Sequence, residues 1–245
     1  PIEALIPNKS YFFFNHTIKK QPYNRKLLQA ILDKNITLYD HETLVNESNH
    51  RLIGFGYYAG VVGAYNGLRA LGLKLNCFEL PKATDLNDRA ALNAQLDLLT
   101  IPNVKIVLTG SGRVGQGAKE ILDHLNIKKV SVDQFINNSF KEAVYVQLDV
   151  LDYCKRKDGT NIGKKDFFNY PEAYQSTFDR FTSVADFFIA GHFYGKGAPV
   201  FFTREQAKAP SFNLKVVADI SCDIDGPVAC TIRPSTIDYP IYGYD

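Results

Sequence analysis

The sequence predicts an α/β protein with a doubly wound parallel sheet, in which helices cover both faces. Strand-length apolar runs alternate with segments of helical periodicity along most of the 245 residues, a pattern typical of parallel sheets. One of these strands runs into a glycine-rich turn that opens a helix. The chain is 45% hydrophobic, which is enough apolar material for one large core or two modest ones.

The amino-terminal part predicts two strands and two helices. Residues 11–14 are predicted as a buried strand and 36–39 as a second strand, with a helix at 24–34 whose apolar side chains share one face. Residues 52–73 are apolar and rich in small side chains. We expect a glycine-rich turn there, followed by a helix that packs closely against another element.

The rest of the sequence predicts the larger sheet. Five strands are expected, at 104–109, 130–132, 144–148, 187–190 and 216–220. The first is followed by a helix with apolar side chains at helical spacing, and the second ends at Asp133. The charged stretch 155–166 is interpreted as a solvated loop rather than as a binding patch.

Composition and charge argue against several classes of protein. The net charge of +2 is too small to favour nucleic acid or a membrane surface, and the apolar runs are too short to span a bilayer. The four cysteines contain no C-x-x-C pair, and the five histidines do not cluster with them, so we expect reduced thiols and no metal site. No signal peptide is recognisable, and we expect a cytoplasmic protein. The sequence lacks methionine, even at its first position, so we expect it to be part of a longer protein.

A phosphate-binding turn is predicted where the strand at 104–109 ends. The pattern G-x-G-x-x-G is formed by six residues: Gly110, Ser111, Gly112, Arg113, Val114 and Gly115. The first glycine permits a tight turn, the second lets the backbone approach a pyrophosphate, and the third lets strand and helix pack closely. The helix N-terminus attracts the phosphates. Asp133 follows Gly110 by 23 residues, near the spacing of about 20 at which a carboxylate receives the adenosine ribose hydroxyls.

This motif predicts a nicotinamide dinucleotide as cofactor. A carboxylate at the ribose repels a 2′-phosphate, so NAD is favoured and NADP is the second choice. The alternative is that the glycines only form a turn and that Asp133 caps a neighbouring segment. The context favours the dinucleotide, because the motif follows a strand, opens a helix and precedes an acid.

Polar residues follow the strand at 11–14. His16, Lys19 and Gln21 lie just after it, and strand ends are where α/β proteins place their chemistry. Taken alone, His16 is more often a structural histidine, and lysines at such a place are more often solvated. His192 also lies at a strand end, and the sequence leaves its role open between packing and chemistry.

Six segments carry a family resemblance. They are 13–24 (FFNHTIKKQPYN), 38–42 (LYDHE), 51–64 (RLIGFGYYAGVVGA), 109–118 (TGSGRVGQGA), 217–223 (VADISCD) and 236–240 (TIDYP). In this order, over nearly all of the chain, they resemble lysine-ketoglutarate reductases and the related saccharopine dehydrogenases. The resemblance implies the two-domain architecture of alanine dehydrogenase and transhydrogenase. Residues 1–55 would belong to the substrate domain, 56–75 to a connecting helix and 76–245 to the Rossmann domain that binds NAD(P), with the fold incomplete at both ends.

The resemblance also implies roles for residues on the substrate side. His16 matches the family's general acid/base histidine, while Lys19 and Gln21 match polar residues that face the substrate. Glu42 and Arg51 match an acid and an arginine that line the amino-acid site, and an arginine suits a substrate carboxylate. On the residues alone, Glu42 and Arg51 would be interpreted as an ordinary surface ion pair.

The reaction implied by the resemblance joins lysine to 2-oxoglutarate and reduces the resulting imine with NAD(P)H to saccharopine, reversibly. Asp223 matches a residue on the cofactor side, and the family's catalytic lysine is expected just upstream of Pro1. The alternatives are an alanine dehydrogenase-like enzyme that uses pyruvate and ammonia, and a non-catalytic dinucleotide-binding protein. We expect small amino-acid and oxo-acid substrates as partners, and the oligomeric state stays open.

Overall fold

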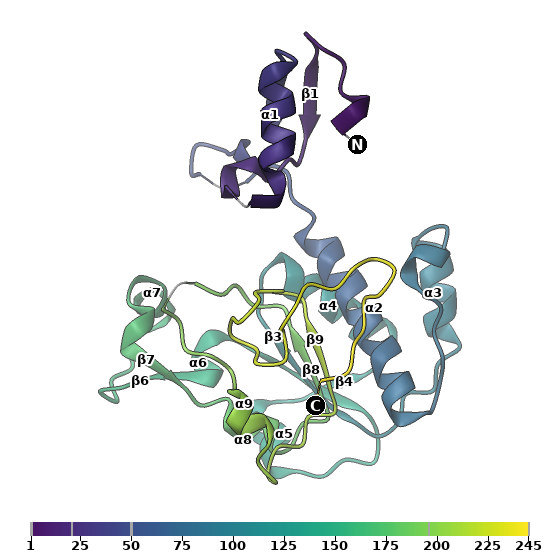
Figure 1. Ribbon diagram of the computed structural model, residues 1–245. Helices are drawn as coiled ribbons and strands as arrows, with labels where there is room; N and C mark the ends of the chain where they lie inside the picture. The colour runs from purple at the N-terminus through teal and green to yellow at the C-terminus, as the bar shows by residue number, and fades with distance from the viewer. Residues whose placement is uncertain (1, 21, 50, 196, 245) are drawn as a thin grey trace. The chain divides into compact units, whose positions relative to one another are not determined.

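The chain divides into two compact units, Pro1–Phe55 and Gly56–Asp245 (Figure 1). The structure is a computed structural model, and it describes residues 2–20, 22–49, 51–195 and 197–244. None of the helices within these ranges is long and apolar enough to cross a membrane. Among the same residues, no group of three or more His, Cys, Asp or Glu side chains is arranged to hold a metal ion.

The first unit contains two parallel strands joined by a helix. β1 (Ser10–Phe13) pairs with β2 (Thr37–Asp40) in a register that sets Phe13 opposite Asp40, and α1 (Arg25–Asp33) lies between them in the sequence. Short 3-10 helices complete the unit: η1 (Ile2–Ala4), η2 (Thr17–Lys19), η3 (Pro22–Asn24) and η4 (His41–Thr43). The prediction that the first strand is buried is wrong. Its side chains alternate between an exposed and a half-buried face, and Phe12 is 62% exposed.

The second unit is built on a five-stranded sheet whose strands are all parallel. The strand order is β4 (Lys128–Lys129), β5 (Val144–Leu148), β3 (Lys105–Thr109), β8 (Phe187–Ala190) and β9 (Val216–Asp219). The predicted α/β fold with a parallel sheet is therefore confirmed. The strand expected at 130–132 is wrong, because Ser131 caps the helix α5 (Val132–Asn137) through a capping box with Gln134, and this ends the extended segment.

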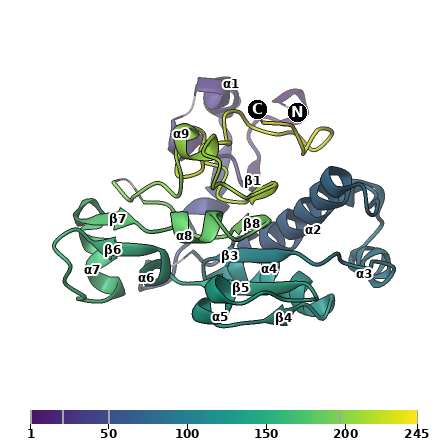
Figure 2. The same cartoon turned by 90° about the horizontal axis from the view of Figure 1, so that it is seen from below.

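Helices cover both faces of this sheet, and each face has its own core. On one face α2 (Gly56–Leu75), α3 (Arg89–Asp97) and α4 (Arg113–His124) pack against Ile106 and Leu108. On the other face α5, α6 (Val150–Tyr153) and α8 (Asp179–Thr182) pack with Val107. Figure 2 looks along the strands and shows α2 and α3 on one side and α6 and α8 on the other. The alternation of inward side chains explains why the strands are apolar throughout.

Glycines let α2 and α4 approach each other closely. A Cβ built on Gly60 would lie 2.0 Å from the carbonyl oxygen of Val114, and one on Gly117 would lie 1.9 Å from that of Tyr57. The small residues of this helix therefore serve its packing, as the sequence predicted. The helix belongs to the second unit.

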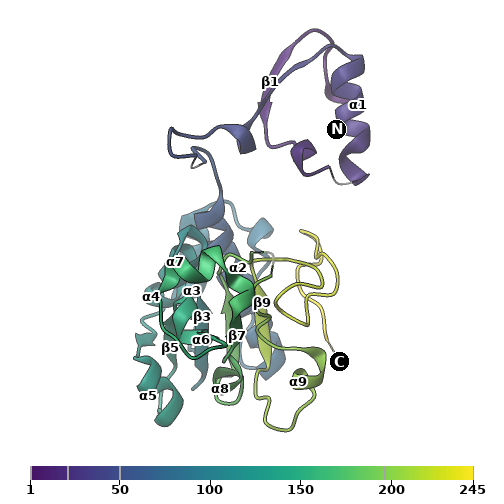
Figure 3. The same cartoon turned by 90° about the vertical axis from the view of Figure 1, so that its left-hand side faces the viewer.

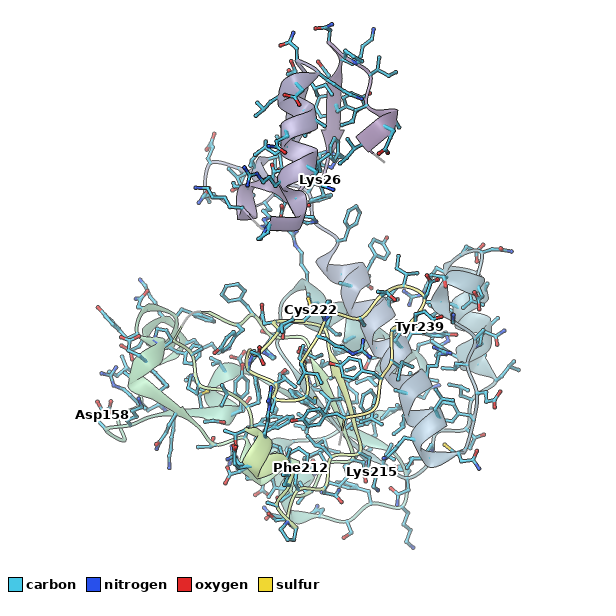
Figure 4. The ribbon with its side chains drawn as sticks, in the orientation of Figure 1. Lys26, Asp158, Phe212, Lys215, Cys222 and Tyr239 are labelled. Carbon is cyan, nitrogen blue, oxygen red and sulfur yellow. The ribbon has the colours of Figure 1, made fainter. Side chains whose placement is uncertain are left out.

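A small subdomain lies between β5 and β8. It consists of α6, β6 (Cys154–Arg156), α7 (Lys164–Asn169), η6 (Pro171–Ala173) and β7 (Tyr174–Ser176), and β6 pairs with β7 antiparallel. Asp166 accepts a hydrogen bond from the Tyr174 hydroxyl at 2.9 Å and pairs with Arg156. The stretch 155–166, expected as a solvated loop, is therefore partly ordered into a strand and the start of a helix. Its tip is marked by Asp158 in Figure 4.

Short elements complete the second unit. They are η5 (Ala83–Asp85), before α3, and α9 (Arg204–Ala207), before β9. After β9 the described residues form no further helix or strand, and Figure 3 shows this carboxyl-terminal segment as coil beside β9. In Figure 4, Lys215 and Cys222 mark the two ends of β9, so the carboxyl edge of the sheet is the one at Cys222.

Candidate active site

A histidine, a glutamate and an arginine come together at one edge of the first unit. Because β1 and β2 are parallel and in register, their carboxyl ends meet, and His16 and Glu42 follow those ends directly. The Nδ1 atom of His16 lies 2.9 Å from Oε2 of Glu42, and Nη2 of Arg51 lies 3.5 Å from Oε1 of the same carboxylate. The structure thus groups two of the predicted substrate-side residues, His16 and Arg51, around the carboxylate of a third, Glu42.

The backbone holds these side chains in place. His16 has a φ of 57° and a ψ of 11°, a left-handed conformation that is uncommon for residues other than glycine. The buried Asn15 beside it accepts hydrogen bonds from the backbone nitrogen of Thr17 at 2.7 Å and from its hydroxyl at 2.5 Å. Asp40 accepts from the backbone nitrogen of Glu42 at 2.9 Å. Both turns are therefore fixed by short polar side chains.

The three side chains of this group differ in their exposure to solvent. The Glu42 side chain is 2% exposed, whereas those of His16 and Arg51 are 45% and 56% exposed. A carboxylate only accepts hydrogen bonds, so Nδ1 of His16 carries the proton in this contact and Nε2 is the basic nitrogen. The imidazole of His16, in one defined tautomer, and the guanidinium of Arg51 are therefore accessible to solvent, and both contact the buried carboxylate of Glu42.

Two other predicted substrate-side residues are less well defined. Lys19 ends η2, but its side chain lies outside the described part of the structure, and Gln21 lies outside the described residues. Sequence reasoning missed a pocket of about 370 Å³ in the same unit, whose lining includes two cationic residues. Its lining is Thr17, Lys20, Pro22, Asn24, Arg25 and Leu28. Asn24 links the pocket to the histidine, because its Nδ2 donates to the carbonyl oxygen of His16 at 3.4 Å.

In the second unit, the glycine turn has the geometry that its sequence predicts. Gly110 has a φ of +92°, and a Cβ there would lie 2.5 Å from the carbonyl oxygen of Gly191. A Cβ on Gly115 would lie 2.2 Å from the carbonyl oxygen of Gly110, whereas one on Gly112 would meet no atom within 4 Å. The first and third glycines are thus needed for the turn and its packing, and the second leaves open space next to the start of α4. This is the arrangement that a dinucleotide pyrophosphate fits.

The other residues of the motif differ in their surroundings. Ser111 and Arg113 are exposed, and no side-chain hydrogen bond caps the first turn of α4 at Gly112. Val114 points inward, since its Cγ2 lies 3.5 Å from the Cβ position of Gly56. Ser111 and Arg113 are therefore the two side chains of the turn that can contact a ligand.

The structure does not bring Asp133 beside this turn. Asp133 lies on α5 after the edge strand β4, and β5 separates β4 from β3. Its Oδ1 accepts a hydrogen bond from Nδ2 of Asn137 at 2.8 Å. The carboxylate beside the turn is Asp149, at the end of β5, to which the Ser111 hydroxyl donates at 3.4 Å.

Asp149 could not be found by motif spacing. It follows Gly110 by 39 residues, because β4 and α5 are inserted before the strand that pairs with β3. The useful signal is that Asp149 directly follows an apolar run predicted as a strand. Which strand adjoins β3 is set by tertiary pairing, which the local pattern does not contain.

His192 lies beneath the turn rather than in solvent. It is 8% exposed, its Nδ1 is 2.9 Å from the Thr109 hydroxyl, and its ring packs on Phe201 with the centroids 4.3 Å apart. Its Nε2 has no hydrogen-bond partner among the described residues. Burial lowers the pKa of His192 to about 4, against a smaller opposing effect of Asp219. The ring is therefore neutral near pH 7, and its surroundings favour the packing interpretation.

The loop after β9 holds the remaining predicted residue, Asp223. Burial, followed by the negative charge of Asp219, raises the pKa of Asp223. Asp219 itself organises the loop by accepting from the hydroxyls of Ser221 and Thr231, both at 2.5 Å. Asp223 therefore lies at the carboxyl edge of the same sheet as the glycine turn, one strand beyond β8.

No protein-family model matches the chain, but curated proteins do. It is 29% identical over 287 residues to a mitochondrial alpha-aminoadipic semialdehyde synthase of Bos taurus, a match that covers 100% of this chain and 31% of the relative. An alpha-aminoadipic semialdehyde synthase of Arabidopsis thaliana is 26% identical over 284 residues, with 100% and 26% covered. A saccharopine dehydrogenase [NAD(+), L-lysine-forming] of Candida glabrata is 26% identical over 226 residues, with 87% and 52% covered.

The chain is a homologue of alpha-aminoadipic semialdehyde synthases and saccharopine dehydrogenases. The resemblance drawn from the six sequence segments is thereby confirmed. The chain spans about a third of the length of the cattle relative. Relatives from cattle, mouse and rat are named as mitochondrial, so they lend no support to the cytoplasmic expectation.

A solved structure supports the fold. The chain matches an L-alanine dehydrogenase with a TM-score of 0.57 at 15% identity, covering 99% of this chain and 58% of that one. The expected likeness to alanine dehydrogenase is confirmed at the level of the fold.

Proposed function

We propose that the protein containing this chain is an NAD(P)-dependent oxidoreductase that acts on the CH–NH bond of saccharopine. In this proposal the first unit contributes the substrate-side groups and the second unit binds the dinucleotide. The observation that carries it is the buried Glu42 carboxylate between His16 and Arg51, in a homologue of saccharopine dehydrogenases.

His16 is proposed as the general acid and base. Formation and hydrolysis of an imine both require proton transfers, which suit an imidazole near neutral pH. Glu42 holds the proton on Nδ1, so Nε2 is the atom that accepts or donates a proton on the substrate side. Glu42 acts on the reaction through His16 and is a positioning residue.

The cations of the first unit suit a substrate with several carboxylates. Arg51 presents a guanidinium that can bind a carboxylate bidentately. Lys20 and Arg25 line the pocket whose wall includes Asn24, the residue hydrogen-bonded to the His16 backbone. We propose that Arg51 and this pocket bind different carboxylates of the amino-acid and oxo-acid substrates.

The glycine turn is proposed to hold the cofactor. Gly112 leaves room for a pyrophosphate, and the backbone N–H groups at the start of α4 would donate to its oxygens. When bound, a nicotinamide dinucleotide supplies or accepts the hydride of the reaction. Ser111 and Arg113 are the exposed side chains of the turn that would contact it.

The test measures oxidation of NADH and NADPH by the full-length protein, followed through the absorbance of the reduced nicotinamide. We expect oxidation that requires lysine and 2-oxoglutarate together. His16→Asn is expected to reduce kcat on the order of 10²-fold or more, while His124→Asn, at a partly exposed histidine at the end of α4 in the second unit, should leave it unchanged.

Two other results would replace the proposal. Oxidation with pyruvate and ammonia, and none with lysine and 2-oxoglutarate, would assign an alanine dehydrogenase-like reaction. Binding of NADH without turnover of either substrate pair would indicate a binding protein. Full activity of His16→Asn on the saccharopine substrates would remove His16 from the chemistry.

A further inference from the structure

The end of β5 carries a charged pair beside the glycine turn. Asp149 directly follows Leu148, whose carbonyl oxygen accepts from the backbone nitrogen of Gly110 at 3.0 Å. Gln147 also reaches the turn, because its Nε2 donates to the Gly110 carbonyl oxygen at 3.0 Å. The last residues of β5 are thus joined to the first glycine, and Asp149 lies where a Rossmann-type sheet brings a strand-end acid to the adenosine ribose.

The Asp149 carboxylate is fixed with one oxygen toward the turn. Its Oδ1 accepts from the backbone nitrogen of Val150 at 2.7 Å, and its own backbone nitrogen donates to Oδ2 of Asp152 at 2.7 Å in a capping box of α6. The other oxygen, Oδ2, contacts the Ser111 hydroxyl. The side chain is 29% exposed, so a ligand can reach it without unfolding the cap.

A lysine pairs with the same oxygen. Nζ of Lys164 forms an ion pair with Oδ2 of Asp149. Lys164 is the first residue of α7 and follows Gly163, which has a φ of +107°. The ordered subdomain anchored by the pairing of Arg156 with Asp166 therefore holds this lysine at the turn. Its side chain is 54% exposed, so it can pair with a ligand in place of Asp149.

We propose that Asp149 and Lys164 together form the adenosine-ribose subsite and set the choice between NAD and NADP. Asp149 takes the 2′-hydroxyl of NAD, and Lys164 takes the 2′-phosphate of NADP. This inference rests on the proposed dinucleotide binding.

The physical basis is the charge of each ligand. A carboxylate accepts hydrogen bonds from ribose hydroxyls but repels a 2′-phosphate, which carries negative charge near pH 7. The ammonium of Lys164 neutralises Asp149 and attracts that phosphate. A site with both charges accepts either cofactor. Removal of the Lys164 charge leaves the site selective for NAD, and removal of the Asp149 charge leaves it selective for NADP. Asp133 plays no part, since it lies on α5 after β4, and β4 does not adjoin β3.

The experiment measures the dissociation constants of NADH and NADPH for the full-length protein, by calorimetry or by fluorescence of the reduced nicotinamide, without substrates. Lys164→Gln is expected to weaken NADPH by about 10-fold or more while NADH stays within about 2-fold, the size expected for one charge-assisted contact. Asp149→Asn, which keeps a residue suited to capping α6, should weaken NADH by a similar factor and strengthen NADPH.

Matched variants decide between this subsite and its alternatives. Lys165→Gln removes the same charge from the next residue of α7, which forms no ion pair with another described residue, and should change neither constant. Asp133→Asn tests the acid predicted from spacing. Loss of NADH affinity in Asp133→Asn but not in Asp149→Asn would overturn the inference, as would equal effects of Lys164→Gln on NADH and NADPH. Because Lys164 is exposed, its variant remains informative even if Asp149→Asn fails to fold.

These outcomes are separate from those of the proposed function. Selective effects on nucleotide binding in a protein that does not turn over saccharopine would leave the inference standing and remove the reaction. Turnover of saccharopine with no selective effect of either variant on nucleotide binding would leave the proposed reaction standing and remove the inference. Absence of binding of both nucleotides would overturn both.

Discussion

Oε2 of the buried Glu42 accepts a hydrogen bond from Nδ1 of the half-exposed His16 at 2.9 Å, between residues that are 26 positions apart in the sequence. The parallel pairing of β1 and β2 produces this contact, because it brings two strand ends to one edge. Arg51 approaches the other oxygen of the carboxylate at 3.5 Å. Glu42 therefore orients the histidine and also reduces the local positive charge.

Glu42→Gln tests this positioning role. The amide of glutamine can present an N–H group to Nδ1, which favours the opposite tautomer of His16 and removes Nε2 as the basic nitrogen. We expect kcat with lysine and 2-oxoglutarate to fall on the order of 10²-fold, with a smaller change in KM. Nitrogen NMR of the imidazole should show the change of tautomer. Glu47→Gln, at an exposed position of the same unit, is the control, and an unchanged tautomer together with unchanged kcat would contradict the role.

Gly60→Ala tests the close crossing of α2 and α4. The new methyl group would lie 2.0 Å from the Val114 carbonyl oxygen and 2.8 Å from the Ala118 nitrogen, and backbone atoms cannot move away cheaply. We expect the free energy of unfolding to fall by about 3 kcal/mol, although alanine favours a helix more than glycine does. Urea denaturation measures the loss. Gly243→Ala, where a Cβ meets nothing within 4 Å, should be nearly neutral, and equal stability of the two variants would refute the crossing.

Gly112→Val separates cofactor binding from folding. Gly112 has a φ of −75°, and a Cβ there meets no atom within 4 Å, so the fold tolerates a side chain. The valine would fill the space that the proposed pyrophosphate needs. We expect the free energy of unfolding to change by less than about 0.5 kcal/mol and the Kd for NADH to rise by about 10-fold or more. Calorimetry measures both, and normal NADH affinity in the folded variant would exclude this turn as the binding site.

Local sequence patterns could predict much of this fold. Apolar runs located β5 at 144–148 and β8 at 187–190 with their observed bounds, and the small-residue stretch located α2. The geometry of the glycine turn could be predicted from its motif, because a positive φ together with so close a backbone contact is possible only for glycine. The meeting of His16 and Glu42 could be anticipated only through the family resemblance, since neither residue indicates its partner.

What could not be predicted depends on tertiary pairing. Periodicity does not say which strand adjoins β3, so motif spacing predicts Asp133 at the ribose and gives no sign of Asp149. The strand expected at 130–132 does not form, and the observed strand is Lys128–Lys129, because Ser131 and Gln134 form a capping box that starts a helix. The charge run predicts a solvated loop around Lys164, because such a run gives no sign of the carboxylate, Asp149, that this lysine contacts.

His192 provides a test through pH. Burial lowers its pKa to about 4, whereas a histidine in the unfolded chain titrates near 6.5. Between these values the unfolded chain binds a proton that the folded chain does not bind. The unfolding free energy therefore has its full value above about pH 6.5 and decreases as the pH falls toward 4. The total decrease is about 3 kcal/mol. His192→Gln should remove this part of the pH dependence, because glutamine does not titrate.

The measurement is urea denaturation of both proteins at closely spaced pH values between about 4.5 and 7.5, a range that covers most of this window. The difference in unfolding free energy between wild type and His192→Gln should narrow as the pH falls. Only the wild type loses stability, because its buried imidazole stays neutral while the imidazole of the unfolded chain is protonated. His124→Gln, at a partly exposed histidine paired with Asp97, should leave the pH dependence that His192 causes unchanged. A constant difference across the range would mean that His192 gains its proton at the same pH in the folded and the unfolded chain, so that the folded protein holds a cationic ring below about pH 6.5. In that case the Thr109 contact would have to be made by a cationic ring, and the packing interpretation of this residue would fail.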